Sequence, residues 1–170
     1  ALSADAFAEL VDELLRAGKL VRRGAFVGDP AHKAELGRDE RVRWERIKPL
    51  LMENRFQPPR VRDIARDTGI AEGEVRALLK RVARVGEVTL VAHDHFFLSD
   101  AVAAMAEIVG ELSAAHGAAR AAEFRDRIGT GRKLAIQILE FFDRVGYTRR
   151  VRDDHLVRRD NPWRAEERRP

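Results

Sequence analysis

Cysteine is absent from this chain of 170 residues, which excludes disulfide bonds, zinc ribbons and thiol catalysis. Aromatic residues make up only 6%, which argues against the stacking platforms that many binders of single-stranded RNA use. A long apolar run and a recognisable signal peptide are also lacking. We therefore expect a cytoplasmic protein with no membrane partner.

Charge is abundant and unevenly distributed. Charged residues make up 35% of the chain, and the formal net charge is +4. Residues 120–170 hold 14 Lys/Arg against 9 Asp/Glu, whereas residues 1–119 hold 18 against 19. Because the whole positive excess lies near the C-terminus, we expect a polyanionic partner to dock there.

The stretch 123–160 reads EFRDRIGTGRKLAIQILEFFDRVGYTRRVRDDHLVRRD. It predicts a short helix, a turn at 129–131, and a longer helix that has Thr130 as its N-cap and ends at Gly146. Strands at 147–151 and 155–157, joined by a turn at 152–154, complete the winged-helix plan. In helix-turn-helix proteins the second helix is the one that meets nucleic acid.

Basic residues surround the start of that second helix. The positive end of the helix dipole makes Arg132 and Lys133 mildly unfavourable there unless a phosphate is bound. We predict RNA-binding residues on the turn, the helix and the wing: Arg125, Arg127, Thr130, Gly131, Arg132, Lys133, Gln137, Tyr147, Arg149, Arg150 and Arg152. Tyr147 could stack on an extruded base or fill the core. Glu140 and Arg144 are expected on a solvated face.

The run FRDRIGTGRKLAIQILEFFDRVGYTRR, followed by DDHLVRRD, resembles the last winged helix of the bacterial selenocysteine-specific elongation factors (SelB). The resemblance implies that this domain binds an mRNA hairpin, the selenocysteine insertion element, and so directs selenocysteine incorporation at UGA. It also implies a GTPase part with GTP and Mg²⁺, selenocysteyl-tRNA and the ribosome as partners. No segment of the sequence resembles the GTPase part, so the chain itself is expected to be a monomeric binding module without enzymatic activity or cofactor.

A shift of 60 residues aligns the chain with itself. Gly69 meets Gly129, and the segments 84–86 and 94–95 meet 144–146 and 154–155. This repeat predicts an earlier winged helix with helices at 61–67 and 72–85 and strands at 88–91 and 95–98. That copy carries Glu72 and Glu74 at the start of its second helix, where acidic side chains repel phosphate. We expect it to act as a spacer or packing domain.

We predict a mainly α fold with small β-hairpin wings, arranged as tandem winged helices. The expected domains are the helix and wing of a partial winged helix at 1–36, complete winged helices at 37–98 and 99–160, and a flexible tail at 161–170. The first segment suggests a fragment that starts inside a winged helix, or alternatively a helix–hairpin cap on the next domain. Pro49 should kink or divide a helix at 38–54. Ser99 or Asp100 should cap a helix that ends near 115, and residues 116–122 should form a connection.

Other readings are weaker. The Gly129–Lys133 turn lacks the spacing of a Walker A loop, so the sequence does not predict nucleotide binding there. His93 and His95 have no third metal ligand at a suitable spacing. Because His95 and His155 are equivalent positions of the repeat beside a turn, we expect a structural role for these two. Two alternatives stay open, namely a tandem winged helix that binds double-stranded DNA and a module that binds another protein.

Overall fold

The apolar periodicity of the chain produces short helices, and some of these helices are followed by a two-stranded hairpin. The computed structural model describes residues 4–23, 26–30 and 35–161. The elements in chain order are α1 (Ala4–Arg16), β1 (Val21–Arg23), β2 (Phe26–Gly28), α2 (Arg38–Glu53), α3 (Val61–Thr68), α4 (Glu72–Val85), β3 (Val88–Ala92), β4 (His95–Leu98), α5 (Ser99–His116), β5 (Ala119–Arg120), α6 (Ala121–Ile128), α7 (Arg132–Arg144), β6 (Thr148–Val151) and β7 (Asp154–Val157).

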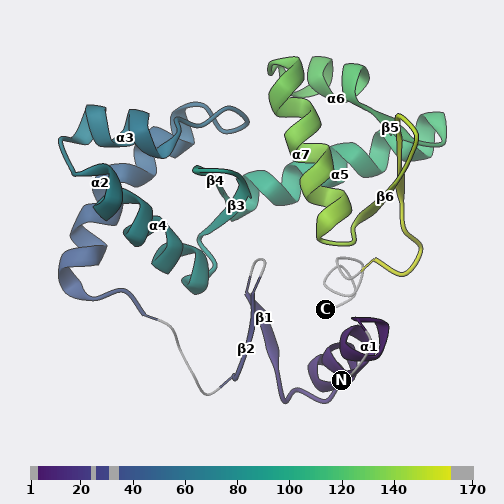
Figure 1. Ribbon diagram of the computed structural model, residues 1–170, viewed down its shortest axis with the longest axis horizontal. Helices are drawn as coiled ribbons and strands as arrows, with labels where there is room; N and C mark the ends of the chain where they lie inside the picture. The colour runs from purple at the N-terminus through teal and green to yellow at the C-terminus, as the bar shows by residue number, and fades with distance from the viewer. Residues whose placement is uncertain (1–3, 24–25, 31–34, 162–170) are drawn as a thin grey trace.

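The predicted tandem of winged helices is confirmed. In the first unit α2, α3 and α4 precede the β3–β4 hairpin, and in the second unit α5, α6 and α7 precede the β6–β7 hairpin. Figure 1 shows the two units side by side, with β3 and β4 between α4 and α7. No described helix is long and apolar enough to cross a membrane.

The predicted 60-residue repeat holds for the helices and slips in the wings. α3 and α6 are offset by 60 residues at both ends, and both end at a glycine with positive φ, Gly69 and Gly129. In the first wing a bulge between Leu90 and Ala92 places the turn at residues 93–94. The second wing pairs without a bulge and turns at residues 152–153, so Asp154 belongs to β7 and not to the predicted turn.

Several predicted helix boundaries are wrong. α2 is a single helix with Pro49 inside it, so proline does not divide it. α5 begins at Ser99 with Leu98 as its N-cap, and no side chain caps it. Residues 116–122 are not a plain connection, because β5 adds a third strand beside β7 and α6 starts directly after it. Strand pairing is decided by the partner, which local sequence does not record.

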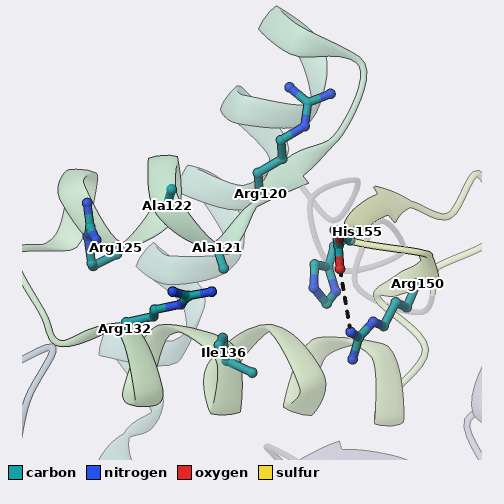
Figure 2. A pocket seen from close by; sticks show the side chains of 9 residues that line it. Arg120, Ala121, Ala122, Arg125, Arg132, Ile136, Arg150 and His155 are labelled. Atoms are coloured by element: carbon teal, nitrogen blue, oxygen red, sulfur yellow. Dashed lines mark ion pairs between the residues drawn. The ribbon is translucent and has the colours of Figure 1, made fainter.

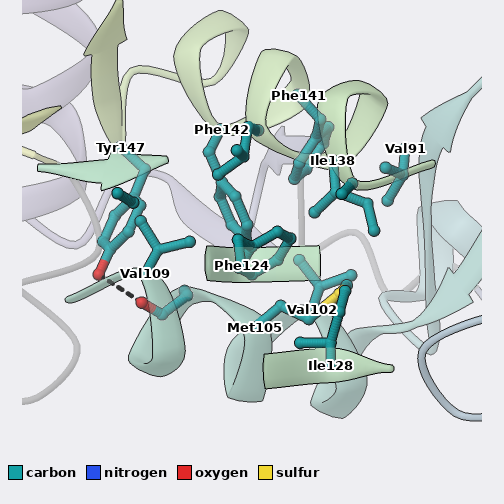
Figure 3. Close-up of a cluster of buried hydrophobic side chains, with 14 of the residues drawn as sticks. Val91, Val102, Met105, Val109, Phe124, Ile128, Ile138, Phe141, Phe142 and Tyr147 are labelled. Atoms are coloured by element: carbon teal, nitrogen blue, oxygen red, sulfur yellow. Dashed lines mark hydrogen bonds between the residues drawn. The ribbon is translucent and has the colours of Figure 1, made fainter. Parts of the chain in front are cut away.

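The two winged helices share a packing interface. Val91 and Phe97 come from the first wing, yet both are buried in the core of the second unit beside Ile138 and Phe141 of α7. Figure 3 shows Val91 meeting Ile138 at the edge of this core. The predicted domain boundary at residue 98 therefore does not separate the two cores. The first winged helix packs against the second, which agrees with the packing role expected for it.

The first unit has its own core around Trp44, which is fully buried. The Trp44 Nε1–H donates to Glu87 Oε2 at 2.7 Å, and Arg41 donates to Glu87 Oε1 at 2.8 Å. Burial alone would raise the pKa of Glu87, but these two hydrogen bonds and the charges of Lys48 and Arg41 outweigh burial and lower it. Glu87 thus ties the start of the first wing to α2.

The N-terminal helix and hairpin resemble the later helix–wing units in outline. α1 ends before Gly18, whose φ is +70°, and β1 pairs antiparallel with β2. Phe7 and Leu10 of α1 are 60% and 41% exposed. Residues 1–3, the hairpin residues 24–25, residues 31–34 and the tail from residue 162 lie outside the described residues. The partial winged helix at 1–36 remains a prediction.

Candidate nucleic-acid interface

A basic cleft lies in the second winged helix, between α6, the start of α7 and the wing. Its volume is ≈ 420 Å³. The residues lining it are mostly basic or small: Arg120, Ala121, Ala122, Arg125, Arg132, Ile136, Arg150, Asp153 and His155. Figure 2 shows Arg132 on α7 and Arg150 on the wing, at opposite ends of this cleft. Four arginines against one carboxylate suit an anion.

Three of the predicted basic residues form surface ion pairs. Arg125 lies 2.6 Å from Asp126, Arg127 lies 2.7 Å from Glu111, and Arg150 lies 3.6 Å from Glu140. All three arginine side chains are between 39% and 58% exposed. Exposed pairs of this kind contribute about 0–1 kcal/mol each, so a phosphate can replace the carboxylate at little cost.

Four other predicted basic residues are exposed and make no side-chain hydrogen bond or ion pair within the described residues: Arg132, Lys133, Arg149 and Arg152. Arg152 occupies the wing turn with φ of +59°, and its carbonyl accepts a hydrogen bond from Arg150 Nε at 2.8 Å. The structure therefore places unpaired cations at two points, the first turn of α7 and the wing.

The predicted cap at Thr130 is wrong. Gly131 is the N-cap of α7, and no side chain caps the helix. The Thr130 hydroxyl donates to Gln57 Oε1 at 3.2 Å, and its N–H donates to the Arg125 carbonyl at 3.2 Å. Thr130 therefore offers no free N–H to a phosphate, whereas the first-turn N–H groups of α7 have no intrahelical acceptor.

Two residues of the predicted surface are occupied by protein. Tyr147 is 9% exposed, and its hydroxyl donates to the Ala106 carbonyl at 2.8 Å, as Figure 3 shows. The core interpretation of Tyr147 is therefore correct and the stacking interpretation is wrong. Gln137 accepts from Arg60 at 3.5 Å, so it faces the first unit and is only partly open.

Arg144 also departs from the expected solvated face. Its guanidinium donates to the Val91 carbonyl at 2.9 Å and lies over the Phe141 ring. Glu140 is exposed as expected and pairs with Arg150. One side of α7 is thus turned towards the wing of the first unit, and this contact is a tertiary feature that helix periodicity does not reveal.

The sequence analysis did not place Arg120, Ile136 or His155 at this cleft, although all three line it. Arg120 lies on β5 and pairs with Asp154 at 2.8 Å, so its side chain is held at the rim of the cleft. Across the 60-residue repeat Arg120 aligns with Arg60, and Ile136 aligns with Arg76. The sequence therefore already shows that the second copy lacks the arginine of the first copy at position 136. Only the folded chain, however, brings β5, α7 and β7 together.

The corresponding place in the first unit is neutralised. Arg76 of α4 donates to both carboxylate oxygens of Asp94, at 2.8 and 2.7 Å, and to Glu72 at 2.6 Å. The hydrogen bond from Arg76 is the main reason that the pKa of Asp94 lies below its usual range. The carboxylates of Asp94 and Glu72 therefore neutralise the Arg76 charge that would otherwise attract an anion. Within the described residues no group of three or more His, Cys, Asp or Glu could hold a metal ion.

Comparison with known proteins identifies both units. Residues 36–97 match the family model described as selenocysteine-specific elongation factor, winged helix domain, and residues 111–157 match elongation factor SelB, winged helix. The selenocysteine-specific elongation factor of Escherichia coli is 37% identical over 149 residues, and that of Haemophilus influenzae is 31% identical over 151. These alignments cover 88% and 89% of the chain but 24% of each relative.

Solved structures agree with the sequence relatives. The mRNA-binding domain of E. coli SelB, solved in complex with SECIS RNA, matches with a TM-score of 0.67 and 40% identity. This match covers 72% of the chain and 99% of the E. coli domain. A bacterial EF-Sec structure matches in fold alone, with a TM-score of 0.55 and 16% identity over 89% of the chain and 24% of its own. The chain therefore belongs to the SelB family of selenocysteine-specific elongation factors and comprises winged-helix domains of that family.

Proposed function

We propose that this chain binds an mRNA hairpin of the selenocysteine insertion type through its second winged helix. The observation that carries the proposal is the similarity to the E. coli SelB domain that was solved with SECIS RNA. The basic cleft and the unpaired cations at the start of α7 supply chemistry that fits a folded RNA backbone.

The proposed contacts divide into backbone and base contacts. Basic residues of the turn, the helix start and the wing hold phosphates: Arg125, Arg127, Arg132, Lys133, Arg149, Arg150 and Arg152. The N–H groups that follow Gly131 add donors at the positive end of the α7 dipole. Sequence specificity comes from loop or bulge bases, because the major groove of A-form RNA is too narrow for a helix.

The contacts of α7 favour RNA over duplex DNA. A helix that enters a major groove needs an open outer face along several turns. In this chain Gln137 and Arg144 are engaged by the first unit. What remains open is the N-terminal end of α7 and the cleft beside it, which suits a hairpin loop or backbone better than a groove.

The wider role follows from the family. The chain spans about a quarter of the length of the relatives it matches. In the proposed arrangement, hairpin binding tethers a GTPase part, which holds GTP and Mg²⁺, with selenocysteyl-tRNA near the ribosome in the cytoplasm. The chain itself acts as a monomeric binding module without cofactor or catalysis.

A competition experiment tests the proposal. A fluorescent SECIS hairpin, the RNA partner of the E. coli domain, is titrated with the chain and then challenged with unlabelled hairpin or duplex DNA. We expect displacement by hairpin only, and an affinity that falls with salt at a log–log slope of roughly −0.7 to −0.9 per phosphate contacted. Displacement by duplex DNA at equal concentration would favour the DNA-binding alternative, and binding insensitive to salt would favour a protein-interaction module.

A further inference from the structure

His155 sits at the floor of the basic cleft in a fixed orientation. It is 4% exposed and lines the cleft from β7. Its Nδ1 lies 2.8 Å from Asp143 Oδ2, and the other oxygen of Asp143 accepts from the Thr148 hydroxyl at 2.7 Å. An ionised carboxylate accepts only, so Nδ1 carries the proton and Asp143 fixes the ring.

The opposite edge of the imidazole is unused. Nε2 of His155 makes no hydrogen bond within the described part of the chain. Figure 2 shows the ring in the space between Arg132 and Arg150, below Arg120. A nitrogen held in place, without a protein partner, at the wall of an arginine-rich cleft is arranged to meet a ligand.

The first unit shows the same histidine in a purely structural setting. His95 occupies the repeat-equivalent position and is 3% exposed, but its Nε2 bonds to the Pro58 carbonyl at 2.7 Å. Burial lowers the pKa of His95. The helix positions around it differ as well. Where the first unit has Ala65, Glu72 and Arg76, the second has Arg125, Arg132 and Ile136.

These replacements all favour an anion in the second copy. Two of them add a cation, and one of those also removes a carboxylate. The third replaces an arginine that reaches Asp94 with the apolar Ile136, which cannot form that ion pair. The second copy thus has an open cleft where the first has an internal ion-pair network.

We propose that the cleft is a phosphate subsite of the RNA surface, in which protonated His155 donates its Nε2–H to a phosphate oxygen. This inference rests on the proposed RNA-binding function. The charged groups that face the ring or its neighbours come from every surrounding element: Arg120, Glu123, Arg125, Arg132, Asp143, Arg150, Asp153 and Asp154.

The subsite has a consequence for pH. A ring that carries its proton on Nδ1 has no donor on Nε2, so a hydrogen bond from Nε2 to a phosphate oxygen requires a second proton on the imidazole. Binding therefore takes up a proton, and affinity rises as pH falls through the range of about 5 to 8 in which imidazoles change charge. Arginine and phosphodiester groups do not titrate there, so the dependence comes from imidazoles, and replacing single histidines assigns it.

The first test compares pH profiles of hairpin affinity between pH 5.5 and 8 for the unmodified chain and His155→Gln. We expect the variant to bind roughly tenfold more weakly at the acidic end, a loss typical of one hydrogen bond between charged groups, and to lose most of the pH dependence. His93→Gln is the matched control, because His93 is a wing-turn residue whose side chain is 93% exposed. Equal profiles for His155→Gln and the unmodified chain would overturn the subsite while leaving RNA binding intact.

The second test observes the ring directly in the unmodified chain. Nitrogen NMR of the histidine rings is followed while inorganic phosphate is added to the unmodified chain at pH 6. We expect a saturable shift of the His155 Nε2 signal and none for His93, and Asp143→Asn should weaken the response. A shift common to all histidines, or none at His155, would overturn the proposal. A His155 response in a chain that fails to bind the hairpin would instead refute the proposed function and retain the anion site.

Discussion

Lys133→Glu separates RNA binding from folding. Lys133 is the second residue of α7, is exposed, and makes no side-chain hydrogen bond or ion pair within the described residues. The change places a carboxylate near the positive end of the helix dipole, which stabilises a helix by about 0.3–1 kcal/mol. We therefore expect the variant to be at least as stable as the original chain.

Its affinity for RNA should fall sharply. For each phosphate contact, the logarithm of the affinity rises by about 0.7–0.9 for every tenfold decrease in salt concentration. Relative to 1 M salt, one contact therefore contributes about 1 kcal/mol at 0.1 M. Charge reversal removes that contact and adds a repulsion of similar size. The total of about 2 kcal/mol corresponds to a roughly 30-fold loss of affinity.

Gly73→Glu is the matched control in the first winged helix. Gly73 is the second residue of α4, aligns with Lys133 across the repeat, and has open space where a Cβ would be added. The same carboxylate is thus introduced at the same helical position of the other copy. We expect helix stabilisation of about 1 kcal/mol from replacing glycine and an affinity within about twofold of the original.

The affinity of both variants for the labelled hairpin is measured by fluorescence anisotropy at salt concentrations between about 0.05 and 0.3 M, where phosphate contacts dominate. Their stability is measured by thermal melting. Lys133→Glu should reduce the magnitude of the log–log salt slope by about 1. Equal losses of affinity in the two variants would show that the charge asymmetry between the copies has been misread. An unchanged affinity in Lys133→Glu would remove α7 from the RNA surface.

Three further predictions concern stability. Tyr147→Phe should cost about 1 kcal/mol of unfolding free energy, because the Ala106 carbonyl loses its donor, and should leave hairpin affinity unchanged; a large loss of affinity would show that the Tyr147 hydroxyl contacts RNA instead. Glu87→Gln should cost about 1 kcal/mol near pH 7 in urea unfolding. Because the pKa of Glu87 is lowered by folding, its contribution is present above the unfolded value and is lost as pH falls, so the two proteins should converge below about pH 4; a constant difference would contradict this. Phe97→Ala should cost about 3–5 kcal/mol and lower a single calorimetric transition of both winged helices, whereas two separate transitions would show that the cores are independent.

Local patterns in the sequence determine most of the helices and wings. The predicted helix at 72–85 is α4 residue for residue, and α3 and α6 share the 60-residue offset. These elements follow from apolar periodicity and from glycines that adopt positive φ, both of which act within a few residues. The contrast of Glu72 with Arg132 is equally local.

Boundaries that depend on distant partners could not be predicted. Thr130 looks like a cap, yet its hydroxyl reaches Gln57 of the first unit. Residues 119–120 have no strand pattern of their own and become β5 because β7 lies beside them. In both cases the competing partner is separated by at least 34 residues, so local propensity had no information about it.

The sequence by itself determined that two copies of one scaffold are present and that only the second has basic residues at the start of its second helix and along its wing, because charge and repeat are written directly in residue order. Tertiary structure alone decided which of those charges can act together. It buried Tyr147, turned Arg144 to the first wing and gathered Arg120, Arg132 and His155 around one cleft. A binding surface depends on distances between elements, and these are fixed only when the two cores pack against each other.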